Sequence, residues 1–588
     1  MGRLVGIDLG TTNSIIAAVI DGKPTVIRGR GNGVTPSVVC FENSETLLVG
    51  EVAKNQAVLS PTKTISSSKR FIGKTLAEVG EETSRAAFIV QASESGGITF
   101  DIGSRKLTPE EVGAFILRHL VDLASEELEE EITEAIITVP AYFTDAQRKA
   151  TEDAGKLAGL SVKRILNEPT AAALAFGLSH KEGGKVIVFD LGGGTFDVSL
   201  LEVGDNVWEV LSTAGDNRLG GDDFDQKLLD WALLETEKIM GIDLRIMPQP
   251  LQRLKVAVEQ AKCTLSSLES AEIGLPFLLP EKGSAGHLNL TISRVTFDEI
   301  TIDLVDRCRD PFLQVLSDAG LSAQDINEVL LVGGSTRIPA IRDLIVELSG
   351  GKQPNTSVNP EEVVALGAAV QAGILSGSVE EMVLLDVTPF SLGVLTGTDS
   401  VTKVILRNTP LPTRKSEFFS TGEHFQRGVD IIILQGESKS AKANNELGRF
   451  ALEGLSKITK GDNLIEVCFE LNENGILNVS AKDVHNERRT SIEITTVGSL
   501  ARKQIEKMAK DSSEVFESNK SKRENGELIS RAEYFKERLN AFVQETGIET
   551  KQIKNILAEI NKSLTKGAKP AKLNDLCRRA EALLSQET

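Results

Sequence analysis

Apolar and polar residues follow two different patterns along this chain. Up to about residue 386, short apolar runs rich in Val, Ile and Leu end at turn residues and are separated by segments with helical spacing; the runs are residues 4–8, 135–139, 186–190 and 329–332. Short apolar strands that alternate with helices are typical of an α/β architecture. One helix start is explicit, because Thr108 precedes Pro109 and is followed three residues later by Glu111, the arrangement of a capping box.

Beyond residue 386 the pattern becomes that of strands. Single polar residues separate four apolar ones, and Asn474-Gly475 follows as a hairpin turn; the apolar positions are Ile465, Val467, Phe469 and Leu471. With a further strand predicted over residues 491–497, this part is predicted to be all-β. After about residue 500 the spacing is helical, with an apolar face formed by Ile553, Ile556, Leu557, Ile560 and Leu564 and a break at Gly567 and Pro570.

The joint between the α/β part and the β part is apolar, which is unusual for a linker. It consists of Met382-Val383-Leu384-Leu385-Asp386. Such a segment is either a buried edge strand or a linker that docks in one state and is released in another. The hydrophobic pattern by itself leaves both alternatives open.

Composition and charge narrow the function classes. The chain of 588 residues has room for two to four domains, and its formal net charge is −19. Residues 498–588 carry 18 Lys and Arg against 14 Asp and Glu, so residues 1–497 carry a net charge of −23. An acidic body with only 4% aromatic residues argues against nucleic acid as a partner.

The cysteines and the chain start predict an intracellular protein. The five cysteines are far apart in sequence and form no C-x-x-C pair, so we expect reduced thiols rather than disulfides or a zinc site. No apolar run approaches the roughly 20 residues of a membrane span, and no leader is predicted at the start. We therefore expect no membrane partner and a cytoplasmic location.

Three glycine-rich motifs each follow a predicted strand. Asp8-Leu9-Gly10-Thr11-Thr12-Asn13 and Asp190-Leu191-Gly192-Gly193-Gly194-Thr195-Phe196-Asp197 both place a carboxylate at a strand end, then glycines and hydroxyls. Glycines allow backbone N–H groups to approach phosphate, and carboxylates can hold Mg²⁺, mostly through water. Two such copies predict duplicated halves that hold one nucleotide. The third motif, Gly333-Gly334-Ser335-Thr336-Arg337, suits the adenosine end, where Arg337 can stack on a base.

These motifs, with several others, closely resemble the heat shock protein 70 family from Leu4 to about Val497 and more weakly beyond. The matching stretches include residues 7–14, 139–143, 167–173, 189–199, 220–225, 332–339 and 384–389. The resemblance implies an actin-like ATPase with a duplicated ribonuclease H-like fold over residues 1–380, a linker over 381–386, a β-sandwich peptide-binding domain over 387–497 and a short helical lid over 498–588.

The resemblance also implies a set of nucleotide-site residues. Lys69, Glu168, Thr195, Asp8 and Asp197 match the catalytic positions, and Asp8, Asp190 and Asp197 match the carboxylates around Mg²⁺ and K⁺. The implied contacts to ATP or ADP are Gly10, Thr11, Thr12, Asn13, Gly192, Gly193, Gly194, Thr195, Glu259, Lys262, Ser266, Gly333, Gly334, Ser335, Arg337 and Glu361. Cys263 occupies a position where some members carry an Arg that stacks on adenine.

Two further groups of residues match by the same resemblance. The positions that relay nucleotide state or meet the linker and a J-domain co-chaperone are Pro140, Arg148, Arg164, Asn167, Leu384, Leu385 and Asp386. The implied peptide-binding residues are Val394, Thr396, Gly397, Phe419, Ser420, Gly422, Val429 and Ile431. Under this interpretation the apolar joint is the family's conditionally docked linker.

The chain departs from the family pattern in its clamp and its lid. Most members have Met and Ala where this chain has Gly397 and Gly422, and those side chains arch over the bound peptide. We therefore expect faster peptide release than in a typical member. The helical part that follows the clamp is short, and we expect a lid that lacks part of the usual bundle.

The implied function is an ATP-dependent chaperone of extended apolar segments. Its implied partners are client polypeptides, a J-domain co-chaperone and a GrpE-like nucleotide-exchange factor, in a bacterial cytoplasm or an organelle of bacterial descent. A specialised chaperone of the iron–sulfur-assembly type remains an alternative because of the short lid and altered arch. Sugar kinases and filament proteins share the actin-like fold, but they lack the linker and sandwich. A passive holdase is opposed by the full set of Lys69, Glu168 and Thr195.

Overall fold

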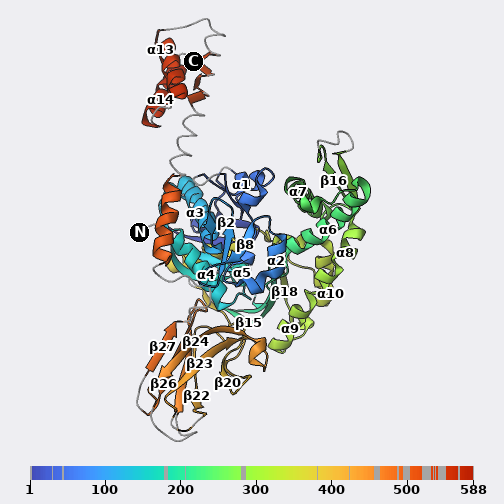
Figure 1. Ribbon diagram of the computed structural model, residues 1–588, viewed down its shortest axis with the longest axis vertical. Coiled ribbons are helices and arrows are strands. Elements are labelled where there is room, and N and C mark those ends of the chain that lie inside the picture. Colours follow the sequence, from blue (N-terminus) through green and yellow to red (C-terminus); the bar gives the residue numbers. More distant parts are fainter. Residues whose placement is uncertain are drawn as a thin grey trace. The chain divides into compact units, whose positions relative to one another are not determined.

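The computed structural model describes residues 3–29, 31–42, 46–177, 183–204, 207–279, 286–380, 382–422, 424, 426–455, 464–485, 489–493, 504–518, 532–533, 535–536, 538–540, 551–566 and 570–586. The chain forms two compact units (Figure 1). One contains residues 1–44 and 48–509, and the other contains residues 45–47 and 510–588.

The first large sheet forms around the N-terminal apolar run. Its strands lie in the order β12-β11-β1-β2-β3, with β4 paired to β2. Strand β1 runs antiparallel to β2 and parallel to β11, and β11 runs parallel to β12. The bounds are β1 (Arg3–Leu9), β2 (Asn13–Ile20), β3 (Lys23–Val26), β4 (Thr35–Pro36), β11 (Ile132–Val139) and β12 (Ser161–Asn167).

A second large sheet repeats this arrangement. Its order is β18-β13-β14-β15-β19. Strand β13 runs antiparallel to β14 and parallel to β18, as β1 does with β2 and β11. In both sheets an aspartate near the end of the first strand, Asp8 or Asp190, precedes a glycine turn into the antiparallel neighbour. The bounds are β13 (Gly184–Leu191), β14 (Phe196–Gly204), β15 (Val207–Asp216), β18 (Glu328–Val332) and β19 (Val383–Leu385).

Two apolar helices pack against both sheets. Helices α5 (Glu168–Gly177) and α11 (Val363–Ser376) share one buried cluster with side chains from both sheets, and alanines make up much of it. The helices approach so closely that a Cβ added to Gly367 would lie 1.7 Å from the carbonyl oxygen of Ala171. Small residues are therefore required where the two helices cross.

Smaller elements extend each sheet into a lobe. The first lobe adds α1 (Glu51–Gln56), α2 (Gly80–Arg85), α3 (Pro109–Leu128), α4 (Asp145–Leu157), β5 (Val39–Phe41), β6 (Leu47–Val49), β7 (Thr64–Ile65), β8 (Ile89–Ala92), β9 (Ile98–Asp101) and β10 (Lys106–Leu107). The predicted start of α3 is confirmed, because Thr108 and Glu111 form a capping box. The second lobe adds α6 (Gly221–Met240), α7 (Pro248–Leu265), α8 (Arg294–Asp306), α9 (Arg309–Ala319), α10 (Pro339–Leu348), β16 (Ser270–Leu275) and β17 (Leu288–Ser293).

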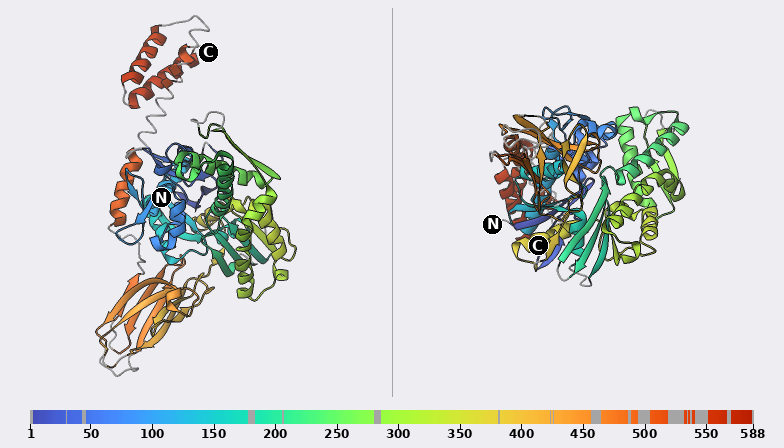
Figure 2. Two further views of the ribbon diagram at one scale, coloured as in Figure 1. Left: turned by 45° about the vertical axis from the view of Figure 1, so that its right-hand side comes forward. Right: turned by 90° about the horizontal axis from the view of Figure 1, so that it is seen from below.

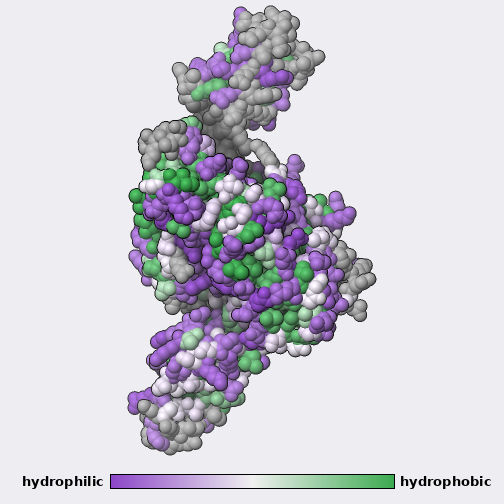
Figure 3. Space-filling model, turned by 90° about the vertical axis from the view of Figure 1, so that its right-hand side faces the viewer, coloured by the Kyte–Doolittle hydropathy of each residue, from purple (hydrophilic) through white to green (hydrophobic). Residues whose placement is uncertain are grey.

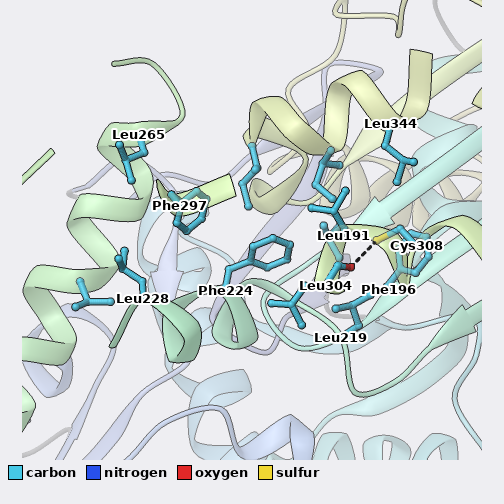
Figure 4. Close-up of a cluster of buried hydrophobic side chains, with 14 of the residues drawn as sticks. Leu191, Phe196, Leu219, Phe224, Leu228, Leu265, Phe297, Leu304, Cys308 and Leu344 are labelled. Atoms are coloured by element: carbon cyan, nitrogen blue, oxygen red, sulfur yellow. Dashed lines mark hydrogen bonds between the residues drawn. The ribbon is translucent and has the colours of Figure 1, made fainter. Parts of the chain in front are cut away.

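The core of the second lobe joins its helices to its sheet (Figure 4). Phe196 from β14, Phe224 from α6 and Phe297 from α8 are fully or almost fully buried there. The thiol of Cys308 lies in the same cluster and donates to the carbonyl oxygen of Leu304 over 3.7 Å. This core fixes the start of α6, which lies beside the glycine turn of Gly192–Thr195.

The β part forms a sandwich of two four-stranded sheets. Their orders are β21-β20-β23-β24 and β22-β25-β26-β27, and one apolar cluster fills the space between them. The predicted hairpin is confirmed, since β25 and β26 pair in antiparallel fashion around Gly475, whose φ is +73°. The bounds are β20 (Leu392–Thr396), β21 (Ser400–Ile405), β22 (Thr413–Ser420), β23 (Gly428–Gln435), β24 (Asn445–Glu453), β25 (Leu464–Leu471), β26 (Leu477–Asp483) and β27 (Arg489–Glu493). Part of the strand predicted over residues 491–497 lies outside the described residues.

The second unit contains helices α13 (Lys551–Lys566) and α14 (Pro570–Gln586), which pack side by side (Figure 2). The predicted apolar face is confirmed: Ile553, Ile556 and Ile560 are buried in a cluster with residues of α14 and with Ala532, Phe535 and Leu539. No helix among the described residues is long and apolar enough to cross a membrane. The face shown in Figure 3 is mostly hydrophilic, with apolar side chains in separate groups.

Candidate active site

The glycine turns of the two large sheets meet at the base of a cleft between the lobes. A Cβ added to Gly193 would lie 1.8 Å from Thr12 Oγ1, and one added to Gly194 would lie 2.7 Å from Thr11 Cγ2. Only glycine permits this approach of two hydroxyl-bearing loops. The cleft has a volume of about 530 Å³, and its lining includes the predicted residues Thr11, Thr12, Asn13, Gly193, Glu259, Lys262, Ser266, Gly334, Ser335, Arg337 and Glu361.

The remaining predicted turn residues adjoin this lining rather than belonging to it. The carbonyl of Gly192 accepts hydrogen bonds from the N–H of Gly221 at 2.9 Å and from Ser335 Oγ at 2.9 Å. Gly333 packs so tightly on Leu191 that a Cβ would lie 2.2 Å from its carbonyl oxygen. Gly10 accepts from Ser37 Oγ at 2.8 Å, and the carbonyl of Thr195 accepts from the N–H of Gly192 at 3.1 Å.

A buried ion pair lies close to the aspartates that end the two first strands. Lys69 Nζ lies 2.7 Å from Glu168 Oε1, and both side chains are nearly buried. Lys69 is carried by η2 (Ser68–Arg70) of the first lobe, and its ammonium also lies 5.5 Å from the centre of the Phe143 ring. Glu168 opens α5. An ammonium held in this way is a fixed positive charge where negative charge can develop during a reaction.

The aspartates themselves are crowded and desolvated. Burial, with a further contribution from Glu168, raises the pKa of Asp8 and of Asp197 to about 7 and that of Asp190 well above its usual range. Asp8 accepts from Thr138 Oγ1 at 3.2 Å, and Asp197 accepts from the N–H of Tyr142 at 2.9 Å. Buried carboxylates without enough positive charge need a cation to stay ionised.

The donor set fits magnesium held mainly through water. Among the described residues, no three Asp, Glu, His or Cys side chains converge on a point where they could all ligate one ion directly. Mg²⁺ commonly keeps several waters and takes only one or two protein carboxylates. Asp8, Asp190 and Asp197 are therefore suited to bind the water shell of such an ion.

The far end of the cleft is formed by α7 and by η7 (Gly334–Arg337). Lys262 Nζ pairs with Asp225 Oδ2 at 2.7 Å and donates to the Gly221 carbonyl at 3.2 Å. Glu259 pairs with Lys54 of the first lobe at 2.8 Å. Arg337 Nε lies 3.3 Å from Glu361 Oε1, and Cys263 is exposed on the cleft wall.

Three of the residues predicted to relay nucleotide state or meet the linker, Arg148, Asn167 and Asp386, form a continuous hydrogen-bonded chain. Arg148 follows the loop that begins at Pro140 and donates to the carbonyl of Ala141 at 3.0 Å and to Asn167 Oδ1 at 2.6 Å. Asn167 Nδ2 donates to Asp386 Oδ2 at 2.7 Å, and Thr170 Oγ1 donates to the same oxygen at 3.2 Å. Asp386 is the last residue of the apolar joint, so this chain connects the joint to both sides of Glu168.

The apolar joint itself is an edge strand. Strand β19 pairs in parallel with β15, with Leu384 opposite Trp208 and Leu385 opposite Glu209. Val383 is 47% exposed, whereas Leu384 is half-buried against the cluster that contains Trp208. The predicted Arg164 lies in β12, and its Nε is buried without a hydrogen-bond partner among the described residues.

The predicted peptide-binding residues are divided between the core of the sandwich and its surface. Val394 and Ile431 are buried, and Phe419 and Val429 are half-buried against the same cluster. Thr396 Oγ1 lies 3.2 Å from Thr402 Oγ1, and Ser420 is exposed. Gly397 and Gly422 have open space around an added Cβ, and Gly397 has a φ of +61°.

Several cleft residues were not predicted from the sequence. Lys54, Arg70, Asp222 and Asp225 line the cleft. Asp222 and Asp225 stand in the Gly220–Asp225 motif that carries the family resemblance, so this motif was the available signal. Lys54 and Arg70 have no local pattern that marks them.

Comparison with known proteins decides the family. A family model described as "Hsp70 protein" matches residues 4–587. This chain belongs to the Hsp70 family. Two relatives named "Chaperone protein dnaK" match 91% of the length of this chain. The one from Cyanidioschyzon merolae is 51% identical, and the match covers 88% of its own length. The one from Cyanophora paradoxa is 50% identical, and the match covers 86% of its own length. "Heat shock 70 kDa protein 7, chloroplastic" from Arabidopsis thaliana is 50% identical over 89% of this chain and 73% of its own length.

As a member of the Hsp70 family, this chain is a chaperone of a family whose proteins bind ATP and assist protein folding. The family's members are ATPases that bind ATP or ADP with Mg²⁺ and act on polypeptides together with co-chaperones. The named relatives are chaperones of the dnaK type, so the comparisons do not favour the iron–sulfur-assembly alternative.

Proposed function

We propose that this Hsp70 chain hydrolyses ATP to ADP and phosphate and uses the reaction to bind and release extended apolar segments of client polypeptides. The observation that carries the proposal is the Lys69–Glu168 pair, at 2.7 Å, beside two glycine turns that meet from duplicated sheets. The repeated strand pattern supports an actin-like, ribonuclease H-like duplicated ATPase. It would occupy residues 1–380.

The proposed chemistry is mainly positioning and charge neutralisation. Lys69 holds a positive charge beside the terminal phosphate, and Glu168 orients the ammonium and accepts from the attacking water. Thr11, Thr12 and Thr195 place their hydroxyls toward the phosphates from turns whose glycines admit them. Glu259, Lys262, Ser266 and Arg337 hold the nucleoside at the other end.

Asp8, Asp190 and Asp197 are the residues that would hold Mg²⁺, with K⁺ as a second cation. When bound, the divalent ion supplies charge neutralisation of the phosphate oxygens. The three buried carboxylates supply acceptors for its water ligands. Burial and the charge of Glu168 raise their pKa values, so these carboxylates need a compensating positive charge to stay ionised.

We further propose that the Arg148–Asn167–Asp386 chain couples the nucleotide to the peptide clamp. The linker, over residues 381–386, would dock through β19 in one nucleotide state and leave β15 in the other. The clamp would be residues 387–497, with Val394, Thr396, Gly397, Phe419, Ser420, Gly422, Val429 and Ile431 around the peptide. The lid would be residues 498–588.

The proposed partners follow from the same cycle. A J-domain co-chaperone would act at Pro140, Arg148, Arg164, Asn167 and the linker residues Leu384, Leu385 and Asp386, and a GrpE-like factor would accelerate ADP release. The compartment would be an organelle of bacterial descent or a bacterial cytoplasm, which agrees with the chloroplastic name of one relative. An acidic surface favours basic partners.

The test is ATP turnover by the purified full chain with and without an extended apolar peptide. We expect steady hydrolysis that the peptide stimulates several-fold, and loss of hydrolysis in Lys69→Ala. The matched control is Lys63→Ala, since Lys63 lies in η1 (Pro61–Lys63), six residues earlier, and is not part of the buried pair. Absence of turnover in the wild-type chain would refute the ATPase. Turnover that ignores peptide would refute the coupling.

A further inference from the structure

The residue two positions before Lys69 has an unusual backbone conformation. Ser67 has φ 52° and ψ 31°, in the left-handed region, and it immediately precedes the turn η2 that carries Lys69. Residues with a Cβ rarely occupy this region unless their surroundings impose it, and Ser has less preference for it than Gly, Asn or Asp. Something in the fold must therefore hold Ser67 in place.

The holding contact comes from the other lobe. Ser67 Oγ donates a hydrogen bond of 2.7 Å to Asp222 Oδ2 in the first turn of α6. The other carboxylate oxygen of Asp222 accepts from Thr12 Oγ1 at 3.3 Å. Asp222 is itself fixed, because its backbone N–H donates to the carbonyl of Gly193 at 2.8 Å.

The other end of the Lys69 turn is held in the same way. Arg70 forms a buried ion pair with Asp223, with Nη1 lying 3.2 Å from Oδ1, and Arg85 Nη1 lies 2.8 Å from the same oxygen. Arg70 Nε also lies 3.4 Å from Asp222 Oδ2. Two adjacent carboxylates of the second lobe thus hold the residues on both sides of Lys69, which belongs to the first lobe.

We propose that Ser67 is a positioning residue for ATP hydrolysis, and that its bond to Asp222 makes the placement of Lys69 depend on closure of the two lobes. When the lobes are closed, the bond imposes the left-handed conformation that directs the turn toward Glu168. When the lobes separate, the bond breaks, Ser67 returns to a common backbone conformation and Lys69 loses its position. The inference rests on the proposed ATPase function.

This arrangement separates nucleotide binding from hydrolysis. Loss of the Ser67 bond leaves the residues that hold the nucleoside, such as Lys262 and Arg337, in place. It removes one of the two constraints on the turn that carries Lys69, and the Arg70–Asp223 pair remains. The chemical step is therefore expected to slow while nucleotide affinity stays nearly constant.

The experiment measures single-turnover hydrolysis of pre-bound ATP and the Kd for ATP in the full chain. We expect Ser67→Ala to slow the chemical step about five- to tenfold with a Kd within twofold of the wild type. Ser67→Gly also lacks the hydroxyl but adopts the left-handed region freely, so we expect it to retain an intermediate rate. Ser67→Asn, which tolerates that region and offers an amide donor, is expected to recover most of the rate. Ser95→Ala, an exposed serine of the same lobe, is the control.

A double-mutant cycle identifies the partner. If the bond acts as proposed, Ser67→Ala slows hydrolysis no further in an Asp222→Ala background. A wild-type rate in Ser67→Ala, or a weaker Kd with an unchanged chemical step, would overturn the proposal, and so would equal rates in the Ala and Gly variants. If the wild-type chain does not hydrolyse ATP, the proposed function fails instead, independently of Ser67.

Discussion

Arg407 Nη2 lies 2.7 Å from Asp318 Oδ1, and this ion pair ties the β-sandwich to helix α9 of the second lobe. Asn408 strengthens the contact, because its Nδ2 donates to Asp318 Oδ2 at 3.0 Å and its Oδ1 accepts from the N–H of Thr213 at 3.2 Å. The same interface includes β19, which pairs with β15. The carboxylate of Asp318 therefore contributes directly to docking of the sandwich.

We predict that Asp318→Ala weakens this docking. Charge-assisted hydrogen bonds contribute about 1.5–3 kcal/mol each, so the equilibrium constant for docking should fall about tenfold or more. Trp208 reports the change, because it is 3% exposed and lies opposite Leu384 of β19. In a Trp231→Phe background, the ATP-bound variant should show red-shifted Trp208 emission relative to the parent.

The control for this prediction is Arg309→Ala. Arg309 lies in α9, as Asp318 does, and the substitution removes its surface ion pair with Glu347 of α10. Emission unchanged by Asp318→Ala would mean that the ion pair does not support docking. A shift of similar size in Arg309→Ala would mean that the effect arises from α9 itself.

We predict that Glu168→Gln slows ATP hydrolysis about 10²–10³-fold, because a neutral amide replaces the carboxylate that pairs with Lys69 and is proposed to accept a proton from the attacking water. The amide retains the size and the hydrogen-bonding oxygen of Glu168, so Lys69 should remain in place. Affinity for ATP is expected to stay within about threefold. A parallel loss of affinity and rate would point to a general disruption of the cleft.

We predict that Gly422→Ala slows release of a bound apolar peptide about two- to fivefold. The added methyl group meets open space in the free protein and can contact the peptide, and one buried CH₂ contributes about 0.8 kcal/mol. Gly204→Ala, at an equally open glycine of β14, is the control. Release of a labelled peptide is followed by fluorescence anisotropy.

Gly397→Met tests the same expectation with a larger side chain. The backbone at Gly397 is in the left-handed region, so any residue with a Cβ at this position costs about 1–2 kcal/mol of folding free energy. Peptide off-rates that stay comparable with and without this substitution would contradict the predicted effect of the open arch.

We predict that Glu110→Gln stabilises the first lobe at alkaline pH. Burial raises the pKa of Glu110 to about 7 from its usual 4.5, so the folded state binds its proton more tightly than the unfolded state. The stabilisation from this group is complete below about pH 4.5 and is lost as the pH rises through about 7. Gln resembles the protonated form and should add at most about 3 kcal/mol at pH 8, with little change at pH 5.

Denaturant unfolding at both pH values measures this difference. The control is Glu126→Gln, an exposed carboxylate of the same helix α3. A gain at pH 5 equal to that at pH 8 would show that the effect does not come from the ionisation of Glu110.

Local features of the fold could be predicted from the sequence because short-range chemistry determines them. The capping box at Thr108, the turn at Asn474-Gly475 and the apolar face of α13 all depend on neighbouring residues. The two glycine turns were also predictable as a pair, since each follows a strand with an aspartate, Asp8 or Asp190, near its end. For the apolar joint, the sequence pattern left open a buried edge strand or a linker that docks and is released. The structure shows an edge strand, β19, but it is not fully buried, because Val383 is 47% exposed.

The contacts that cross the cleft could not be predicted in this way. Ser67 and Asp222, Lys54 and Glu259, and Arg407 and Asp318 are far apart in sequence, and no spacing links them. Their approach depends on how the lobes and the sandwich pack, which is a property of the whole fold. Ser67 is the clearest example of a feature that sequence spacing does not predict, because a residue of the other lobe holds it in its left-handed conformation.

The chain from Arg148 through Asn167 to Asp386 has a further consequence. Asn167, the last residue of β12, and Thr170, in the first turn of α5, both hold the Asp386 carboxylate and stand on either side of Glu168. In the proposed cycle, the junction of β12 and α5 would therefore serve the phosphate site and the linker at once. The two proposed sites would then be linked through shared hydrogen bonds, and the signal between them would need no long path through the protein. Any change that loosens this junction should uncouple hydrolysis from peptide release without unfolding either domain.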